Sequence, residues 1–345
     1  MYVNKNFSLK GVLAFGGPHF LWLSMWASFV TGLYVFTEWK IIAIPWLPLS
    51  VIGTAVAFYI GFKNNQAYDR LWEARKIWGG IVNDSRKWGS VVKAYVRNHH
   101  NEAEHTTLEI QTAVKRLLYR HIAWLYTLRN QLLIPAPWEH INQGKHLRRV
   151  TQQRRKRFGV GLLEDHDTEV MLREHLPENE YQELIDYQNT ATQIIDYQSQ
   201  DLAALRTSGM IEDFRHMELQ NVLNSFYDHQ GKCERIKKFP LPRQYGSMSV
   251  IFVGIFIFLL PFGMLPEFQK LGDIGVWMAI PFTTLVSWVF LIMELVGDYS
   301  ENPFEGLGND IPMLSLCRTI EIDLKEMLRE ADLPTPVEAR NGVLM

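Results

Sequence analysis

The chain has 345 residues, with 35 Lys and Arg against 37 Asp and Glu, and its formal net charge is −2. Such an even balance does not indicate a nucleic-acid partner. Hydrophobic residues make up 47% of the chain and aromatic residues 12%, which is high for a soluble protein. The mean hydropathy of −0.09 is nevertheless too low for a chain made only of membrane spans. The composition therefore indicates membrane-embedded and water-facing parts in one chain.

Four stretches without Asp, Glu, Lys or Arg are long enough to cross a bilayer, which takes about 20 helical residues. They cover residues 11–37, 41–62, 244–266 and 274–293. Short connections join the first to the second and the third to the fourth, so the stretches predict two helical hairpins. The first stretch exceeds the apolar core of a signal peptide, and we expect it to be retained.

Basic residues lie at the ends of the hairpins that are expected on one side of the membrane. They are Lys5, Lys10, Lys63, Arg70, Arg75, Lys76, Lys232, Arg235, Lys237, Lys238 and Arg243. An excess of Lys and Arg marks the cytoplasmic ends of membrane helices. We therefore expect both termini and the central region to be cytoplasmic.

The second stretch runs directly into the charged sequence "GFKNNQAYDRLWEARKIWGG", residues 61–80. No Pro or Gly lies between Phe62 and Trp78, so one helix is expected to continue from the bilayer into water. Thr54 and Phe58 precede Phe62 at intervals of four residues, which puts all three on one helical face.

Polar residues follow this face on the aqueous half of the same helix; they are Gln66, Asp69, Arg70 and Glu73. An apolar stripe above a polar one suits a hydrophobic constriction that opens into a polar vestibule, as in an ion pore. The stripe alone is also typical of a helix that faces lipid or packs against another helix.

The central region, residues 63–243, is predicted to be helical, and no alternating strand pattern occurs. Residues 177–207 predict one amphipathic helix. Its apolar positions are Leu184, Tyr187, Ala191, Ile194, Ile195, Leu202 and Leu205, and Gln198 is the one polar break. The basic stretch "KHLRRVTQQRRKR", residues 145–157, is interpreted as a solvated loop or helix face, with contact to anionic lipid as the alternative.

Catalytic and metal-binding patterns are scarce. His100 and Glu104 share a helical face, but without a second pair of ligands we expect an exposed polar helix. Carboxylates gather after the last span at Glu294, Asp298, Glu301, Glu305 and Asp310. They suit a hard cation but do not match a calcium-binding EF-hand loop, and we favour a polar turn. Cys233 and Cys317 fit no zinc or disulfide pattern, so we expect reduced thiols and no cofactor or metal.

Three motifs resemble the bestrophin family, in particular its bacterial branch. They are "FKNNQAYDRLWEARKIWG" after the second span, "CERIKKFPLPRQY" before the third, and "NPFEGLGNDIPMLSLCRTIEIDLKEML" after the fourth. The order and spacing of the spans match over nearly the whole chain. Lys63 stands where the family usually has Arg.

The resemblance implies an all-α, funnel-shaped homopentamer with four transmembrane helices per subunit and a large helical cytosolic region. Its segments would be residues 1–62, 63–243, 244–297 and 298–345. The second helix of each subunit would line one pore, with a neck formed by Thr54, Phe58 and Phe62. Thr54 is more polar than the family's usual residue, so the outer neck is expected to be wetter.

The resemblance also implies a second constriction at the cytosolic exit, on residues 208–229. Met217 is the predicted aperture residue, and Met210, Ile211 and Phe214 are its rivals. Animal members bind calcium through consecutive acids after Asn-Pro-Phe, whereas this chain has only Glu305 and Asp310 as weak calcium candidates. We therefore expect this motif to pack the tail instead of binding calcium.

The chain is thus expected to form a channel, not an enzyme, in the bacterial inner membrane. Its partners would be copies of itself, membrane lipids and the permeating monovalent ions. Those ions would be chloride, as is typical of the family, or cations, as in some bacterial members. One alternative is a membrane enzyme that uses His100, Glu104 or Glu294, and another is a non-conducting scaffold.

Overall fold

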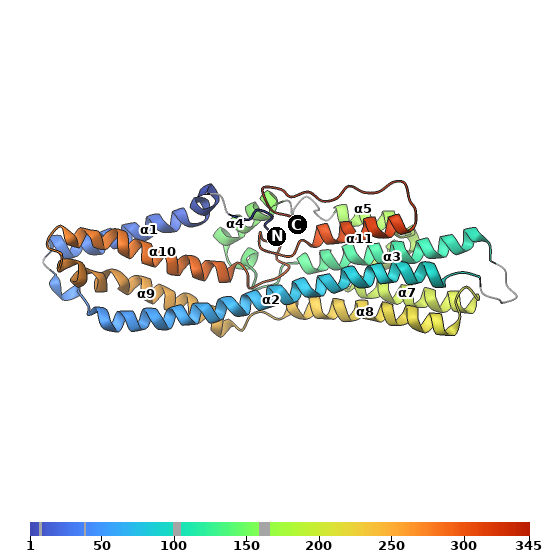
Figure 1. Cartoon of the computed structure of the whole chain (residues 1–345), viewed down its shortest axis with the longest axis horizontal. Coiled ribbons are helices and arrows are strands. Elements are labelled where there is room, and N and C mark those ends of the chain that lie inside the picture. The colour runs from blue at the N-terminus through green and yellow to red at the C-terminus, as the bar shows by residue number, and fades with distance from the viewer. Residues whose placement is uncertain (7–8, 38, 99–104, 159–165) are drawn as a thin grey trace. The chain divides into compact units, whose positions relative to one another are not determined.

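The computed structural model describes residues 1–6, 9–37, 39–98, 105–158 and 166–345. Every regular element in these residues is a helix (Figure 1), and the only β contacts among them are isolated bridges from Tyr2 and Arg340 to Val343. The expected all-helical fold is confirmed. The chain divides into two compact units, which we name the membrane unit (Asn4–Arg70 and Pro240–Asn302) and the extramembrane unit (Met1–Val3, Leu71–Phe239 and Pro303–Met345).

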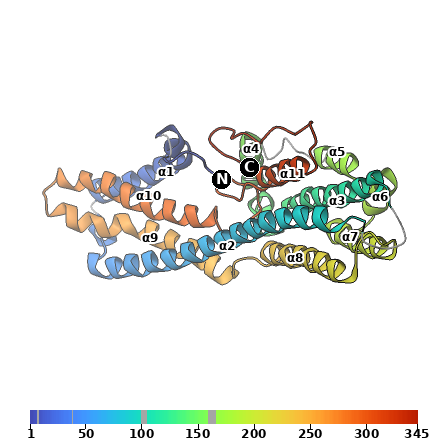
Figure 2. The ribbon, with the colours of Figure 1, turned by 45° about the vertical axis from the view of Figure 1, so that its right-hand side comes forward.

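The membrane unit contains the four predicted spans. Its helices are α1 (Leu9–Phe36), the first half of α2 (Trp46–Tyr95), α9 (Arg243–Gln269) and α10 (Ala279–Asp298), with the 3-10 turns η1 (Lys40–Ile42) and η4 (Gly275–Met278). Among the described residues, four helical segments are long and apolar enough to cross a membrane: Gly11–Phe36, Lys40–Tyr95, Arg243–Gln269 and Gly275–Asp298. In two views α1, α9 and α10 run side by side (Figures 1 and 2).

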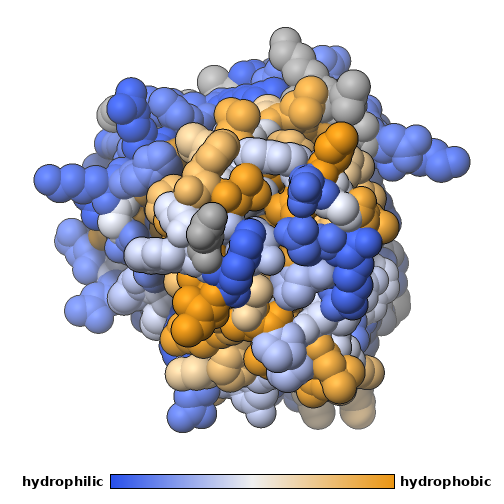
Figure 3. Space-filling view, turned by 90° about the vertical axis from the view of Figure 1, so that its left-hand side faces the viewer, coloured by the Kyte–Doolittle hydropathy of each residue, from blue (hydrophilic) through white to orange (hydrophobic). Residues whose placement is uncertain are grey.

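The connections within the two hairpins lie at one end of this unit (Figure 1). Trp39 and Ile41 are exposed there on the first connection, and Leu271 and Ile274 on the second. Figure 3 shows hydrophobic side chains interspersed with polar ones across this face. Such a mixture, with Trp among it, suits the boundary between lipid and water.

The second helix packs against α9 through a glycine and apolar side chains. Val56 and Ile60 of α2 share a buried cluster with Phe256 of α9. A Cβ atom added to Gly53 would lie 2.7 Å from the Phe256 ring, so glycine is required for this approach. Without a hydrophobic drive between helices in lipid, close contact of this kind holds membrane helices together.

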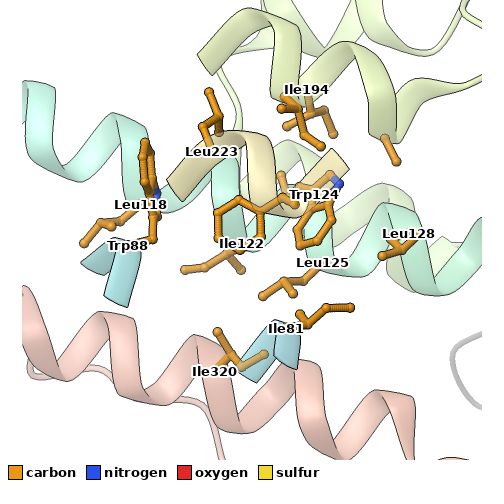
Figure 4. Packing of buried hydrophobic residues seen from close by; sticks show 14 of the residues in the cluster. Ile81, Trp88, Leu118, Ile122, Trp124, Leu125, Leu128, Ile194, Leu223 and Ile320 are labelled. Carbon is orange, nitrogen blue, oxygen red and sulfur yellow. The ribbon is translucent and has the colours of Figure 1, made fainter. Parts of the chain in front are cut away.

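The extramembrane unit is built around α3 (Thr107–Leu133), which buries residues on all sides. It also holds the second half of α2, together with η2 (His140–Asn142), α4 (Lys145–Phe158), α5 (His166–His175), α6 (Glu178–Leu184), α7 (Thr190–Thr207), α8 (Asp213–Lys238) and α11 (Met313–Met327). Figure 4 shows Trp88 of α2, Trp124 of α3 and Ile320 of α11 in its hydrophobic core. Thr106 and Glu109 form a capping box that begins α3.

The prediction of one helix over residues 177–207 is wrong, because α6 and α7 are separate. The Asn189 side chain accepts a hydrogen bond from Thr192 N and so begins α7 as its N-cap. Tyr187 lies in the break and is exposed, whereas the other predicted apolar positions are buried. Gln198 is fully buried, and neither of its side-chain amide atoms has a hydrogen-bond partner within the described parts of the chain.

Both ends of the chain belong to the extramembrane unit and lie side by side (Figure 1). Val3 N donates to Gly342 O at 3.0 Å, and Leu344 N donates to Met1 O at 2.8 Å. The first residues are therefore held by the last ones through backbone hydrogen bonds.

Candidate functional site

One face of α2 is exposed throughout the membrane unit. Leu47, Val51 and Thr54 are exposed on it, followed by Phe58 at 67% and Phe62 at 69% exposure. Their spacing of three and four residues places them on one line. The structure thus places the three predicted neck residues on one surface that the chain itself leaves uncovered.

The opposite face of α2 is buried. Gly53, Val56, Ile60, Lys63 and Ala67 all have little or no exposed surface. Burial of this face against the rest of the chain fixes the rotation of α2 about its axis. Thr54 Oγ1 donates to Ser50 O at 2.9 Å, so its hydroxyl hydrogen is used within the helix.

The predicted vestibule residues divide into two pairs. Gln66 and Asp69 are exposed and continue the stripe below Phe62. Arg70 Nε instead donates to Glu301 O at 3.1 Å, and Glu73 forms an ion pair with Arg235. Two of the four candidates therefore present their polar groups to solvent, while two are held by their own chain.

The predicted aperture residue and its rivals differ in exposure. Met217 on α8 is 62% exposed and Phe214 is 85% exposed. Met210 and Ile211 are instead buried in the hydrophobic core of the extramembrane unit. Phe214 and Ile211 also border a cavity of about 490 Å³ beside an Arg206–Asp213 ion pair of 2.5 Å.

The two weak calcium candidates are engaged by the chain itself. Glu305 Oε1 accepts from His140 N at 2.8 Å, and His140 Nδ1 lies 2.9 Å from Oε2. Asp310 accepts from the backbone N–H groups of Phe304, Gly306 and Ile311 at 2.7 to 2.9 Å. Both carboxylates are buried, and their oxygens hold the loop in which Phe304 has a left-handed φ of 69°.

Of the three residues of the enzyme alternative, only Glu294 belongs to the described part of the chain. His100 and Glu104 lie outside the described residues. Glu294 is buried in the membrane unit and contacts Lys63 and Ser249. In the described part of the chain no group of three or more His, Cys, Asp or Glu is placed to hold a metal ion. Cys233 and Cys317 are buried free thiols, and burial raises the pKa of Cys317 to about 12.

The contact between Lys63 and Glu294 is one that sequence reasoning did not find. These residues are 231 positions apart and belong to different spans. The available signal was that each is a charged residue at the end of an apolar stretch, where a buried charge requires a partner. That signal does not specify which partner.

The basic stretch of residues 145–157 forms most of α4 and is exposed over most of its length. Arg148 Nε donates to Ile141 O at 3.1 Å. Arg155, Lys156 and Arg157 form no ion pair with any residue that the structure describes. The stretch is thus a helix with an exposed basic face, and contact of that face with anionic lipid stays a prediction.

Comparison with known proteins places these features in a family. Residues 14–326 match a family model described as bacterial and fungal bestrophin protein. The chain is 28% identical over 291 residues to "Voltage-dependent anion channel-forming protein YneE" of Escherichia coli O157:H7, a match that covers 84% of this chain and 79% of the relative. It is 25% identical to "Voltage-dependent anion channel-forming protein RSc3414" of Ralstonia nicotianae, over 86% of this chain and 82% of the relative.

Solved structures agree with this. The crystal structure of a bacterial bestrophin homologue from Klebsiella pneumoniae superposes with a TM-score of 0.73 at 22% identity, over 91% of this chain and 98% of that chain. A crystal structure of a mutant of that homologue superposes with a TM-score of 0.72 at the same 22% identity, over 92% of this chain and 100% of the mutant chain. At this level of identity the likeness establishes the fold.

Proposed function

Since this chain belongs to the bacterial and fungal bestrophin family, we propose that it forms an oligomeric channel for monovalent ions in the bacterial inner membrane. The observation that carries the proposal is the uncovered stripe of α2. It is apolar from Leu47 to Phe62 except at Thr54, and polar from Gln66 to Asp69. A stripe of this kind is expected where several copies of one helix surround a pore.

The neck would be made of rings of Thr54, Phe58 and Phe62, one residue of each kind from every subunit. Apolar rings restrict ion flow by excluding water until they widen. Family membership supports a homopentamer as the assembly. Met217 is the proposed aperture residue and Phe214 stays its rival, because both are exposed on α8 while Met210 and Ile211 are buried.

Chloride is the first candidate ion, since the relatives in Escherichia coli and Ralstonia are named as anion channel-forming proteins. Monovalent cations are the alternative. Apolar rings carry no charge with which to select, so selectivity depends on the field below the neck. There the exposed stripe carries Asp69 and then Lys76, two charges of opposite sign.

The sidedness of the channel follows from its basic flanks. Lys63 and Arg70 follow the second span and Arg243 precedes the third, so all three lie on one side of the membrane, as is typical of the cytoplasmic side. We infer that the extramembrane unit and both termini are cytoplasmic. Protease protection of a C-terminal tag in inside-out and right-side-out vesicles tests this orientation, and a tag digested only in right-side-out vesicles would contradict it.

Current through the purified protein in a planar bilayer with asymmetric NaCl is the direct test. A reproducible conductance is expected, and the sign of the reversal potential separates chloride from cations. Phe58→Ala should widen the neck and raise the current. Phe29→Ala, which truncates a similarly exposed Phe on α1, is the matched control and should leave it unchanged.

The opposite result would favour a non-conducting scaffold. If wild type, Phe58→Ala and Phe62→Ala are all silent while the oligomer stays intact, the neck is not a conduction path. If the protein conducts but Phe58→Ala leaves the current unchanged, Phe58 does not belong to the constriction.

A further inference from the structure

A buried polar cluster joins three membrane helices directly after the neck. Lys63 Nζ of α2 forms an ion pair with the Glu294 carboxylate of α10. Ser249 Oγ of α9 donates a hydrogen bond to the second carboxylate oxygen. The Lys63 and Glu294 side chains are 1% and 4% exposed, and Ser249 is buried with them.

A second contact holds the same level of α2 against α10. Asn64 Nδ2 donates to Met293 O at 3.0 Å. A Cβ atom at Gly297 would collide with the Asn64 side chain, so the absence of a side chain at Gly297 lets α10 approach. Two consecutive residues of α2 are thus engaged by two consecutive residues of α10.

Helical geometry links the direction of Lys63 to the direction of Phe62 in the neck. Successive residues of an α-helix are rotated by about 100° around its axis, so a residue that points inward fixes the direction of the next one. Phe62 immediately precedes Lys63, and Phe62 is exposed while Lys63 is buried. Turning α2 would move Lys63 out of its pairing, leaving a buried charge without a partner, which is costly in a membrane protein.

We propose that Lys63, Glu294 and Ser249 are positioning residues for ion flow, because they hold α2 in the rotation that directs Phe62 into the neck. The proposal rests on the channel function above and adds the contacts that fix the direction of Phe62. The cluster does not touch the permeating ion; it acts through Phe62.

The test replaces the charges without leaving one unpaired. Lys63→Arg keeps the charge and should conduct like wild type, as should Ser249→Thr, which keeps the hydroxyl. The double variant Lys63→Met, Glu294→Met replaces both charges by apolar side chains of similar length, a change that buried ion pairs often tolerate in stability. It should assemble to the same oligomer, with an altered conductance.

A second readout reports the rotation without any current. Phe62→Cys is reacted with a charged, water-soluble thiol reagent in liposomes, and the buried Cys233 and Cys317 supply the unmodified background. When Phe62→Cys is combined with the double Met substitution, the rate at which the reagent modifies this cysteine should fall about tenfold, because thiol reactivity follows exposure. Lys63→Arg should preserve the rate.

The two readouts separate the possible failures. Unchanged conductance and an unchanged reaction rate in the double Met variant would overturn the positioning role. So would an altered conductance with an unchanged rate, because the cluster would then act without turning α2. If wild-type protein is silent, the channel function fails, yet the reaction rates still decide whether the cluster sets the rotation of α2.

Discussion

Glu321 on α11 should make the extramembrane unit sensitive to acid. Its carboxylate is buried, accepts a hydrogen bond from Tyr126 Oη at 2.6 Å and pairs with Lys325 Nζ at 2.9 Å. His175 Nε2 lies 3.5 Å away. Burial alone would raise the pKa of Glu321, but the contacts with His175, Tyr126 and Lys325 outweigh it and lower this pKa from 4.5 to about 2.

The size and sign of the effect follow from proton linkage. A difference of about 2.5 pKa units between unfolded and folded chain corresponds to about 3 kcal/mol of folding free energy. In the unfolded chain Glu321 takes up a proton near pH 4.5, whereas in the folded protein it does so only near pH 2. The stabilisation is therefore fully present above pH 4.5 and is lost as the pH falls towards 2.

The substitution Glu321→Gln removes this titration. Thermal unfolding of the purified protein in detergent, followed at fixed scan rate from pH 7 to pH 3, should show a large loss of stability at pH 7 and a difference from wild type that shrinks below pH 4.5. Glu326→Gln on the same helix is the control, because Glu326 is exposed. Equal pH dependence in wild type and Glu321→Gln, or the same change in Glu326→Gln, would refute the reasoning.

Three further substitutions test packing and buried charge. Gly53→Ala should destabilise the membrane unit by about 1–3 kcal/mol through overpacking, whereas Gly61→Ala, whose Cβ meets nothing within 4 Å, should not; equal midpoints of thermal unfolding would contradict this. Burial lowers the pKa of His121 from 6.5 to about 3, so wild-type stability should decline as the pH falls below 6.5, and His121→Gln should flatten that decline in the same scans. Arg120→Met should cost about 3–5 kcal/mol by leaving the buried Glu180, to which Arg120 donates at 2.5 and 2.9 Å, without its cation; a midpoint within error of wild type would show that the pair contributes nothing.

The spans and the continuous second helix could be predicted from the sequence. A stretch free of charged residues for about 20 positions has few other stable environments than a bilayer. The four-residue spacing of Thr54, Phe58 and Phe62 places them on one face whatever surrounds the helix. Both features depend on local composition and helical geometry, and the structure has them at these residues.

Local periodicity was less informative where polar side chains compete for the backbone. The apolar spacing over residues 177–207 continues through the break between α6 and α7, and the Asn189 cap interrupts the helix without disturbing that spacing. Met210 and Ile211 were rivals of Met217 for the predicted aperture, yet they pack into the core. Which of several apolar residues is buried depends on the neighbouring helices.

Partners distant in the chain were decided only by the tertiary structure. Nothing in the sequence pairs Lys63 with Glu294, 231 residues later, or directs the Glu305 and Asp310 carboxylates to His140 and the nearby backbone N–H groups. A single helix determines which of its own residues share a face. Which group lies opposite them depends on how helices from distant parts of the chain pack, and burial then makes the pairing obligatory because an unpaired charge cannot remain there.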